Sequence, residues 1–534
     1  MNIIVKSRCI FDGKRKTPYA GYVKIKEDRI EAVVEADGLP ENIQDYRVID
    51  CGDKTIMAGF CDAHVHLYLG AMESATVNVF YSANEEEAAA ALYDFYKDDE
   101  GPWVIGFGWS HYRWPGEKLP TKESLDRLFP DRPVVVFNDE LHGIWVNSKA
   151  LALCGITKNS PEPKGGLIKR DEEGNPTGYL LEVPAMRLIT EKALNMTEDF
   201  EEKMLRSFTQ KAYQRGVTSV GDVQILNMVK PKVYEKMIEK GALGVRVMFA
   251  PEIELEISEA QRLSETYHSD RLKFIGLKGF LDGTPLGYTG LLVEEYTQQP
   301  GQFGKLLMDE TWLQEKADSC YAHGISLRLH ACGDGAVRTA LDVFEAAQKK
   351  QGKEACEKVR NTIEHIELIH PADMGRFEKT GTIASIQPGH MIMESLEQHP
   401  IFQIVGEARA KLSWPGKSLE RAGAKVAFST DYPIVDLNPF DTLYRATMRV
   451  MEDDLPEGGW NPEEKFSLAE ALNNTTINAA YLLQMEDKVG SLEEGKLADL
   501  VVLDCNLFTL GNENLLKARV EKTIFAGEVV YTRD

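Results

Sequence analysis

Two histidines in one short apolar segment have the spacing that chelates a divalent metal ion. His64 and His66 close the run from Met57 to Leu67. Alternate side chains of a β-strand point to the same face, so the two imidazoles would project together from one strand end. Imidazole is a common ligand of zinc, iron and nickel. The pair is a weak signal by itself, because surface and core histidines also fall at this spacing.

Four later residues that can bind a metal lie within or at the ends of strand-like runs: Lys278, His330, His365 and Asp431. Most have a structural explanation when taken alone. A single His is often a hydrogen-bonded structural residue, and Asp431 could form a turn. Lys278 is harder to explain, because a buried ammonium needs a partner. Their shared location at strand ends predicts a metal centre on one rim.

The elements that must position these residues form eight strand-like runs, most of them followed by a helical segment. The runs begin at Ile56, Val217, Val245, Phe274, Ile325, Asn361, Thr382 and Lys425. This order predicts an α/β protein built on a (β/α)8 TIM barrel, whose active site lies at the C-terminal strand ends. A doubly wound sheet is the alternative, but no Gly-x-Gly-x-x-Gly follows the first strand.

The ends of the chain are predicted to join in a small composite β-domain. Residues 1–55 and 487–534 both contain short strand patterns separated by turns, and neither stretch is long enough to bury a core alone. The barrel domain would then span residues 56–486. Within it, residues 70–215 form a large insertion after the first strand, and an insertion at that position is expected to build the substrate pocket.

The overall composition excludes some functions. The chain has 534 residues and a net charge of −23, from 61 basic and 84 acidic residues. That charge argues against nucleic acid as a partner, since phosphates need a basic surface. No apolar stretch approaches the ~20 residues that span a bilayer, and no signal-peptide pattern opens the chain. The eight scattered cysteines are expected to be reduced thiols. We therefore expect a cytoplasmic protein that acts on a small molecule.

Further motifs give the chain a resemblance to a known family. They are Gly59 to His66, Gly165 to Glu182, Leu277 to Gly283, His330 to Ala336, Ile363 to His365, Ser385 to His390, Ser429 to Pro433 and Gly490 to Asp504. With these motifs the chain resembles the amidohydrolase superfamily of metal-dependent hydrolases. It is most similar to the YtcJ-like branch, which includes the N-substituted formamide deformylases. The resemblance covers essentially the whole chain.

The resemblance implies one or two divalent ions, with zinc the expected metal. His64 and His66 would hold the more buried ion, and His330 and His365 the second. Asp431 would ligate the buried ion and serve as the general base. It would take a proton from the attacking water and pass it to the leaving amine.

Two residues compete to bridge a pair of ions. Lys278 could do so as a carbamate formed by addition of CO2, and it lies on a predicted barrel strand. Glu182 already carries a negative charge but lies in the insertion. We favour Lys278, which leaves Glu182 to bind substrate or to support a ligand. A single-metal site with unmodified Lys278 stays open.

The predicted substrate contacts are His142, Glu182, His390 and Trp109. His142 and His390 match motifs of the YtcJ-like branch, although both could be structural. Trp109 belongs to an aromatic patch that ends at Trp114. That patch could wall the pocket, or it could form the hydrophobic core of the insertion.

The leading functional prediction is hydrolysis of an amide-like C–N bond, other than a peptide bond, in a small molecule. One alternative is an aminohydrolase that deaminates a heterocycle. Such relatives typically carry His-x-x-Glu at the fifth strand, whereas this chain reads His330-Ala-Cys-Gly333. A non-catalytic metal-binding homologue is the other alternative, and retention of Asp431 argues against it. The sequence leaves the oligomeric state open, a homodimer included.

Overall fold

The chain divides into two compact units in a computed structural model that describes residues 2–39 and 43–533. Unit 1 comprises residues 1–67, 209–224 and 244–534, and unit 2 comprises residues 68–208 and 225–243. Both have an α/β fold with mixed sheets. In the part of the chain that is described, no helix is long and apolar enough to cross a membrane.

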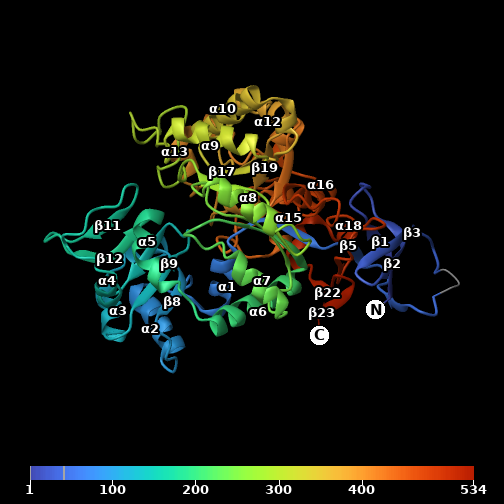
Figure 1. The fold of residues 1–534 in the computed structure, drawn as a ribbon, viewed down its shortest axis with the longest axis horizontal. Helices are drawn as coiled ribbons and strands as arrows, with labels where there is room; N and C mark the ends of the chain where they lie inside the picture. The colour runs from blue at the N-terminus through green and yellow to red at the C-terminus, as the bar shows by residue number, and fades with distance from the viewer. Residues whose placement is uncertain (1, 40–42, 534) are drawn as a thin grey trace. The chain divides into compact units, whose positions relative to one another are not determined.

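Both ends of the chain contribute to one eight-stranded sheet of unit 1, ordered β23-β22-β21-β5-β1-β2-β3 with β4 paired to β1. The strands are β1 (Ile3–Phe11), β2 (Tyr19–Lys26), β3 (Arg29–Glu35), β4 (Arg47–Asp50), β5 (Thr55–Ala58), β21 (Leu500–Leu503), β22 (Val520–Phe525) and β23 (Glu528–Thr532). The pairing of β21 with β5 joins the two ends. Figure 1 shows the blue N-terminal and red C-terminal strands in one region of this unit.

One strand boundary differs from the prediction. Ile56 to Ala58 lie in β5 of the composite sheet, and the strand that carries the His-x-His segment, β6 (Phe60–Val65), begins after Gly59. A Cβ at Gly59 would lie 2.4 Å from the hydroxyl oxygen of Thr218, so only glycine lets the chain pass from one sheet to the next here.

The remaining strands of unit 1 form two parallel sheets. One sheet has the order β15-β14-β13-β6 and the other β16-β17-β18-β19-β20. The strands besides β6 are β13 (Val217–Val223), β14 (Arg246–Ala250), β15 (Leu272–Phe274), β16 (Leu277–Phe280), β17 (Leu327–Ala331), β18 (Thr362–His365), β19 (Ile383–Ile386) and β20 (Lys425–Phe428). Most of their residues are buried, as expected for parallel strands covered on both faces.

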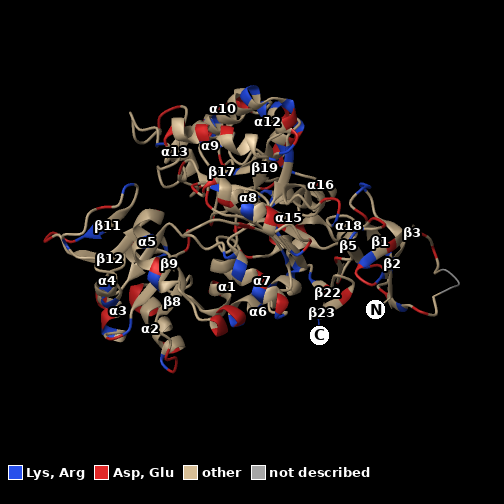
Figure 2. Cartoon of the chain, in the orientation of Figure 1, with Lys and Arg blue, Asp and Glu red and all other residues tan. Residues whose placement is uncertain are grey.

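Helices follow most of these strands, as the sequence predicts. They include α8 (Ile257–Thr266), α9 (Glu310–Ala322), α10 (Asp334–Gln351), α12 (Arg376–Thr380), α13 (Ile401–Ala410), α14 (Gly416–Arg421), α15 (Pro439–Met448), α16 (Leu468–Asn474) and α17 (Ile477–Leu482). Asp309 caps α9, and Ser467 with Glu470 forms a capping box on α16. Figure 2 shows acidic and basic residues interspersed along helices such as α10 and α12.

Unit 2 is built on a six-stranded sheet of order β11-β12-β10-β9-β8-β7. Its strands are β7 (Val77–Asn78), β8 (Val104–Trp109), β9 (Val134–Asn138), β10 (Gly143–Val146), β11 (Leu167–Arg170) and β12 (Pro176–Leu181). Its helices are α1 (Leu67–Ala75), α2 (Glu85–Tyr96), α3 (Lys122–Leu128), α4 (Ser148–Leu153), α5 (Glu182–Ala193), most of α6 (Glu198–Arg215) and α7 (Pro231–Glu239). Asn84 caps α2, and β11 and β12 pair as an antiparallel hairpin.

Candidate metal centre

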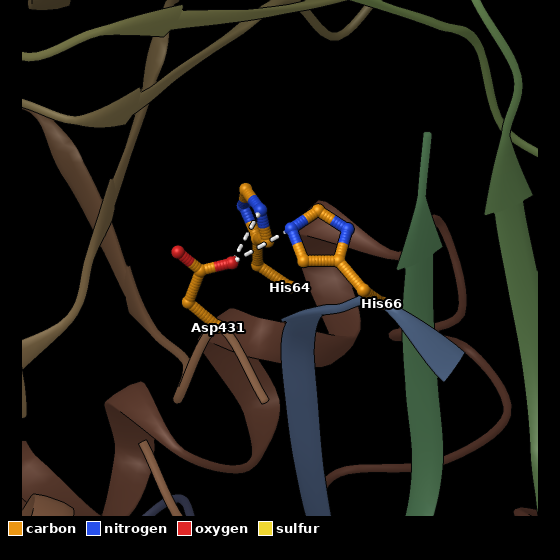
Figure 3. Close-up of side chains that lie close together, drawn as sticks. All are labelled: His64, His66 and Asp431. Atoms are coloured by element: carbon orange, nitrogen blue, oxygen red, sulfur yellow. Dashed lines mark ion pairs between the residues drawn. The ribbon is translucent and has the colours of Figure 1, made fainter. Parts of the chain in front are cut away.

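Three ligand atoms converge at the end of β6. The Nε2 atoms of His64 and His66 each lie 3.1 Å from Oδ1 of Asp431 (Figure 3). All three side chains are buried. Ligands bound at 2.0–2.1 Å around a tetrahedral ion lie roughly 3.3 Å apart, so this spacing suits one divalent ion. The three residues therefore form a group that could hold a metal.

Backbone hydrogen bonds fix this convergence. Asp431 follows β20, and its N–H donates to the carbonyl of His64 over 2.9 Å. The N–H of His66 donates to the carbonyl of Tyr432 over 2.8 Å. Asp431 has a φ of 61°, which is uncommon for a residue other than glycine. The chain thus adopts a strained conformation at the residue that completes the group.

A buried carboxylate also ties the two segments together. Asp62 accepts hydrogen bonds from the backbone N–H and the hydroxyl of Thr430, at 3.0 and 2.6 Å. Burial raises the pKa of Asp62 to about 7. Asp62 precedes His64 by two residues and Thr430 precedes Asp431 by one, so this link sets the distance between ligands. Asp62 is not among the predicted site residues, although it lies in the same short segment as His64 and His66.

The other ring nitrogens have partners that present Nε2 to the site. Nδ1 of His66 lies 2.9 Å from the carbonyl oxygen of Val223, which can only accept a hydrogen bond. That Nδ1 therefore carries the proton, and Nε2 keeps a lone pair for a metal. Nδ1 of His64 lies 2.8 Å from Oε2 of Glu364. Burial disfavours the charged form of Glu364, but Arg328 and His64 outweigh it and hold the pKa of Glu364 well below its usual range.

Asp431 is ionised in this environment. Burial alone would raise its pKa, but the neighbouring His64 and His66 outweigh that effect and lower the pKa well below its ordinary value. Its second oxygen, Oδ2, lies 3.6 Å from Nε2 of His390 and 3.9 Å from Nδ1 of His365. Asp431 therefore belongs to two groups that could hold a metal, the second formed with His365 and His390.

The predicted ligands of a second ion fall in different groups. His330 and His365 have ring centroids 4.5 Å apart. His330 Nε2, however, lies 3.3 Å from Sγ of Cys332 and 3.7 Å from Oδ1 of Asp282, and these three form a group of their own. Cys332 and Asp282 are potential ligands that are not among the predicted site residues. The joint binding of a second ion by His330 and His365 stays a prediction.

Lys278 lies on β16 and is buried. Burial lowers its pKa to about 8, and its Nζ has no hydrogen-bond partner within residues 2–39 and 43–533. The ammonium lies 4.9 Å from the ring centroid of Phe280. A lysine in this setting is more readily neutral than one in water, as the prediction of a modified side chain requires.

The predicted substrate contacts of the insertion lie in unit 2. His142 Nδ1 lies 3.0 Å from Oε2 of Glu182, and the two side chains are 31% and 34% exposed. Trp109 is fully buried, packs against Trp114 and donates its indole N–H to the carbonyl of Val136. Trp109 thus occupies the core of unit 2, which is the alternative that the sequence left open.

The chain is similar in sequence to known proteins along nearly its whole length. A sequence model of the amidohydrolase family matches residues 47–531. The chain is 28% identical to the protein LONG AFTER FAR-RED 3 of Arabidopsis thaliana, over 99% of this chain and 91% of that one. It is 26% identical to YtcJ of Bacillus subtilis, over 96% and 98% of the two chains. Identity to an N-substituted formamide deformylase of Arthrobacter pascens is 27%, over 92% and 90%.

Solved structures share the fold. An uncharacterized metal-dependent hydrolase from Pyrococcus horikoshii superposes with a TM-score of 0.79 at 22% sequence identity, covering 96% of this chain and 99% of that one.

Proposed function

The chain belongs to the amidohydrolase family, and from that premise we propose that it hydrolyses an amide-like C–N bond, other than a peptide bond, in a small molecule. The observation that carries this proposal is the convergence of His64, His66 and Asp431. Two imidazoles and a carboxylate leave part of a metal's coordination open, as hydrolytic sites require. The name of the formamide deformylase among the relatives suggests the first substrates to test.

We propose that the two parallel sheets of unit 1 close into one (β/α)8 barrel. Isolated parallel bridges support closure at both joins, since Val65 pairs with Tyr432 beyond β20 and Glu252 pairs with Lys278 of β16. β15 and β16 would then be two halves of one strand, interrupted at Gly276. In such a barrel, ligands at the C-terminal ends of strands face one reaction site.

The donor set fits zinc. His64 and His66 supply imidazole nitrogen and Asp431 supplies carboxylate oxygen, the ligand types of catalytic zinc sites. A bound zinc ion would polarise the substrate carbonyl and lower the pKa of water to about 7. His64 and His66 hold their positions through partners on Nδ1, so they would supply nitrogen lone pairs in a fixed geometry rather than proton transfer.

Asp431 is the proposed proton carrier. Its pKa lies well below neutrality, so it is ionised and can take a proton from the attacking water. It would then return that proton to the leaving nitrogen. His390 lies 3.6 Å from Oδ2 of Asp431, and burial lowers its pKa, so it is neutral near pH 7. A neutral imidazole there can orient the substrate by hydrogen bonding.

We also propose that Lys278 carries a carbamate. Addition of CO2 requires a neutral amine, and burial lowers the pKa of Lys278 to about 8. If two divalent ions bind, a carbamate on Lys278 would supply a negative charge that offsets their mutual repulsion. Replacing Lys278 by Ala should abolish activity, and a short carboxylic acid should restore part of it. A fully active Lys278→Ala variant, with loss of metal in Glu182→Ala, would assign the bridge to Glu182.

The proposed reaction is tested by an assay of purified, metal-replete protein against N-formyl, N-acyl and cyclic amides. Aminated heterocycles belong in the same panel, because release of ammonia from them would favour a deaminase. Turnover of an amide that is lost with a chelator and restored by zinc supports the proposal. Turnover confined to the heterocycles would replace it.

A further inference from the structure

A chain of buried charged groups runs behind His64. Oε2 of Glu364 lies 2.8 Å from Nδ1 of His64, and Oε1 of the same carboxylate accepts a hydrogen bond from Nε of Arg328 over 2.6 Å. The side chains of all three residues are at most 2% exposed. Glu364 therefore uses one oxygen to hold the imidazole and the other to hold the guanidinium.

The same guanidinium reaches the backbone next to the ligand. Nη2 of Arg328 donates to the carbonyl oxygen of Ala63 over 2.8 Å. Ala63 directly precedes His64, although Arg328 is 265 positions away in sequence. Glu364 on β18 thus contacts the ring of His64, and Arg328 on β17 contacts the peptide group that precedes His64 on β6.

Stability is a poor explanation for these charges. Moving an ion pair from water into an interior costs about as much as the pair returns, and apolar groups of similar volume often do as well. The carboxylate of Glu364 has another effect, which is to fix the tautomer of His64. A hydrogen bond from Nδ1–H of His64 to Glu364 fixes the tautomer in which the Nε2 lone pair faces Oδ1 of Asp431.

The two histidines differ in this respect. Nδ1 of His66 donates to a neutral acceptor, the carbonyl of Val223. Nδ1 of His64 faces a carboxylate, and a charged acceptor raises the basicity of a ligating imidazole more than a carbonyl does. Loss of Glu364 would therefore weaken the ligand at His64 and leave the partner of His66 in place.

We propose that Glu364 and Arg328 are positioning residues that set the affinity for the metal by fixing the ring and the tautomer of His64. The proposal rests on the metal site in the proposed function. Neither residue would contact the metal or the substrate directly. Glu364 would act on the ring of His64, and Arg328 would hold Glu364 and the backbone at Ala63. Removal of such a supporting group typically weakens metal binding about 10–100-fold.

The test uses Glu364→Gln and Arg328→Lys. Glutamine keeps an acceptor for His64 but carries no charge, and it points a second donor at Arg328. Lysine keeps the charge but has a single nitrogen in place of the two, Nε and Nη2, that bond Glu364 and the carbonyl of Ala63 separately. Zinc affinity of the metal-free protein is measured by competition with a chromophoric chelator, alongside the unfolding temperature.

Arg246→Lys is the matched control. Arg246 forms a buried pair with Asp499 through hydrogen bonds of 2.6 and 2.9 Å, and these side chains are also at most 2% exposed. Among the described residues, this pair forms no hydrogen bond or ion pair with His64, His66 or Asp431. The control therefore carries the stability cost of the same substitution without the proposed effect on the metal.

We expect both test variants to bind zinc about 10–100-fold more weakly than wild type, with Arg246→Lys unchanged even if its unfolding temperature falls as far. Wild-type affinity in folded Glu364→Gln and Arg328→Lys would overturn the inference. Should Glu364→Gln fail to fold, the zinc affinity of Arg328→Lys is compared with that of Arg246→Lys and wild type in the same way. A wild-type protein that binds no zinc would instead overturn the metal site itself.

Discussion

The carboxylate of Asp62 holds Thr430 by two hydrogen bonds, one to its backbone N–H and one to its hydroxyl. Through this link the segment that carries His64 is fastened to the segment that carries Asp431. The arrangement explains how ligands from opposite parts of the sequence keep a spacing of 3.1 Å.

Thr430→Val removes the hydroxyl and keeps the shape of the side chain. We expect unfolding to become easier by about 1–3 kcal/mol, because a buried acceptor loses its partner. Zinc affinity should fall as well. The control is Thr218→Val, since the hydroxyl of buried Thr218 makes a single long hydrogen bond within the described residues, 3.5 Å to the carbonyl of Phe60. The free energy of unfolding of both variants is measured by chemical denaturation. An equal decrease in the two would contradict the inference that the bond between Thr430 and Asp62 matters more than an ordinary buried hydroxyl.

Asp431→Asn separates proton transfer from metal binding. Asparagine keeps the size and one oxygen but cannot accept the proton. We expect turnover to fall at least about 10²-fold, while much of the metal is retained. Metal analysis and steady-state kinetics on the same sample measure both. Asp436 lies on the same loop as Asp431 and forms partly exposed ion pairs with Lys211 and Arg215 of α6, so Asp436→Asn should keep its activity. Normal turnover in Asp431→Asn would place the base elsewhere.

Acid should destabilise the protein through His399. Burial lowers the pKa of His399 to about 4, and its ring packs between Trp414 and Trp460. The unfolded chain takes up a proton near pH 6.5 and the folded chain does not, so stability is full above pH 6.5 and falls as the pH drops toward 4. The loss is on the order of 3 kcal/mol.

His399→Phe should remove that part of the pH dependence. Unfolding free energies of both proteins between pH 7 and pH 4 give the comparison, with exposed His268→Gln as the control. An identical slope for wild type and His399→Phe would contradict the assignment.

Two residues of unit 2 should respond to substitution in different ways. Trp109→Ala should cost about 3–5 kcal/mol of stability, because it empties a large core position. His142→Ala should leave stability nearly unchanged, since the side chain is partly exposed, and should alter substrate preference if it binds substrate as predicted. Limited proteolysis and kinetics with several amides distinguish the two effects. Strong unfolding of His142→Ala would make its pair with Glu182 structural.

The metal ligands can be predicted from the sequence more readily than the residues that hold them in position. His64 and His66 stand out by spacing, and Asp431 by its position after a strand, so the group they form is accessible from local pattern. Glu364 and Arg328 carry no such signal. Each lies within a buried strand, and their partners are 300 and 265 positions away, so only the arrangement of strands reveals the contacts.

Strand boundaries show the same limit. The apolar run around Gly59 predicts one continuous strand, because periodicity does not register a change of sheet. The structure divides it between β5 and β6, since β5 pairs with β1 and β21 while β6 pairs with β13. Trp109 is a similar case, because an aromatic cluster has the same composition in a core and in a pocket wall.

The metal content of the purified protein tests the central claim most directly. Elemental analysis and zinc titration of wild type should show at least one tightly bound ion per chain. A double variant with His64→Ala and His66→Ala should lose that ion, because both imidazoles face the same carboxylate oxygen. Full occupancy of the folded double variant would contradict the assignment of His64, His66 and Asp431 as the metal site.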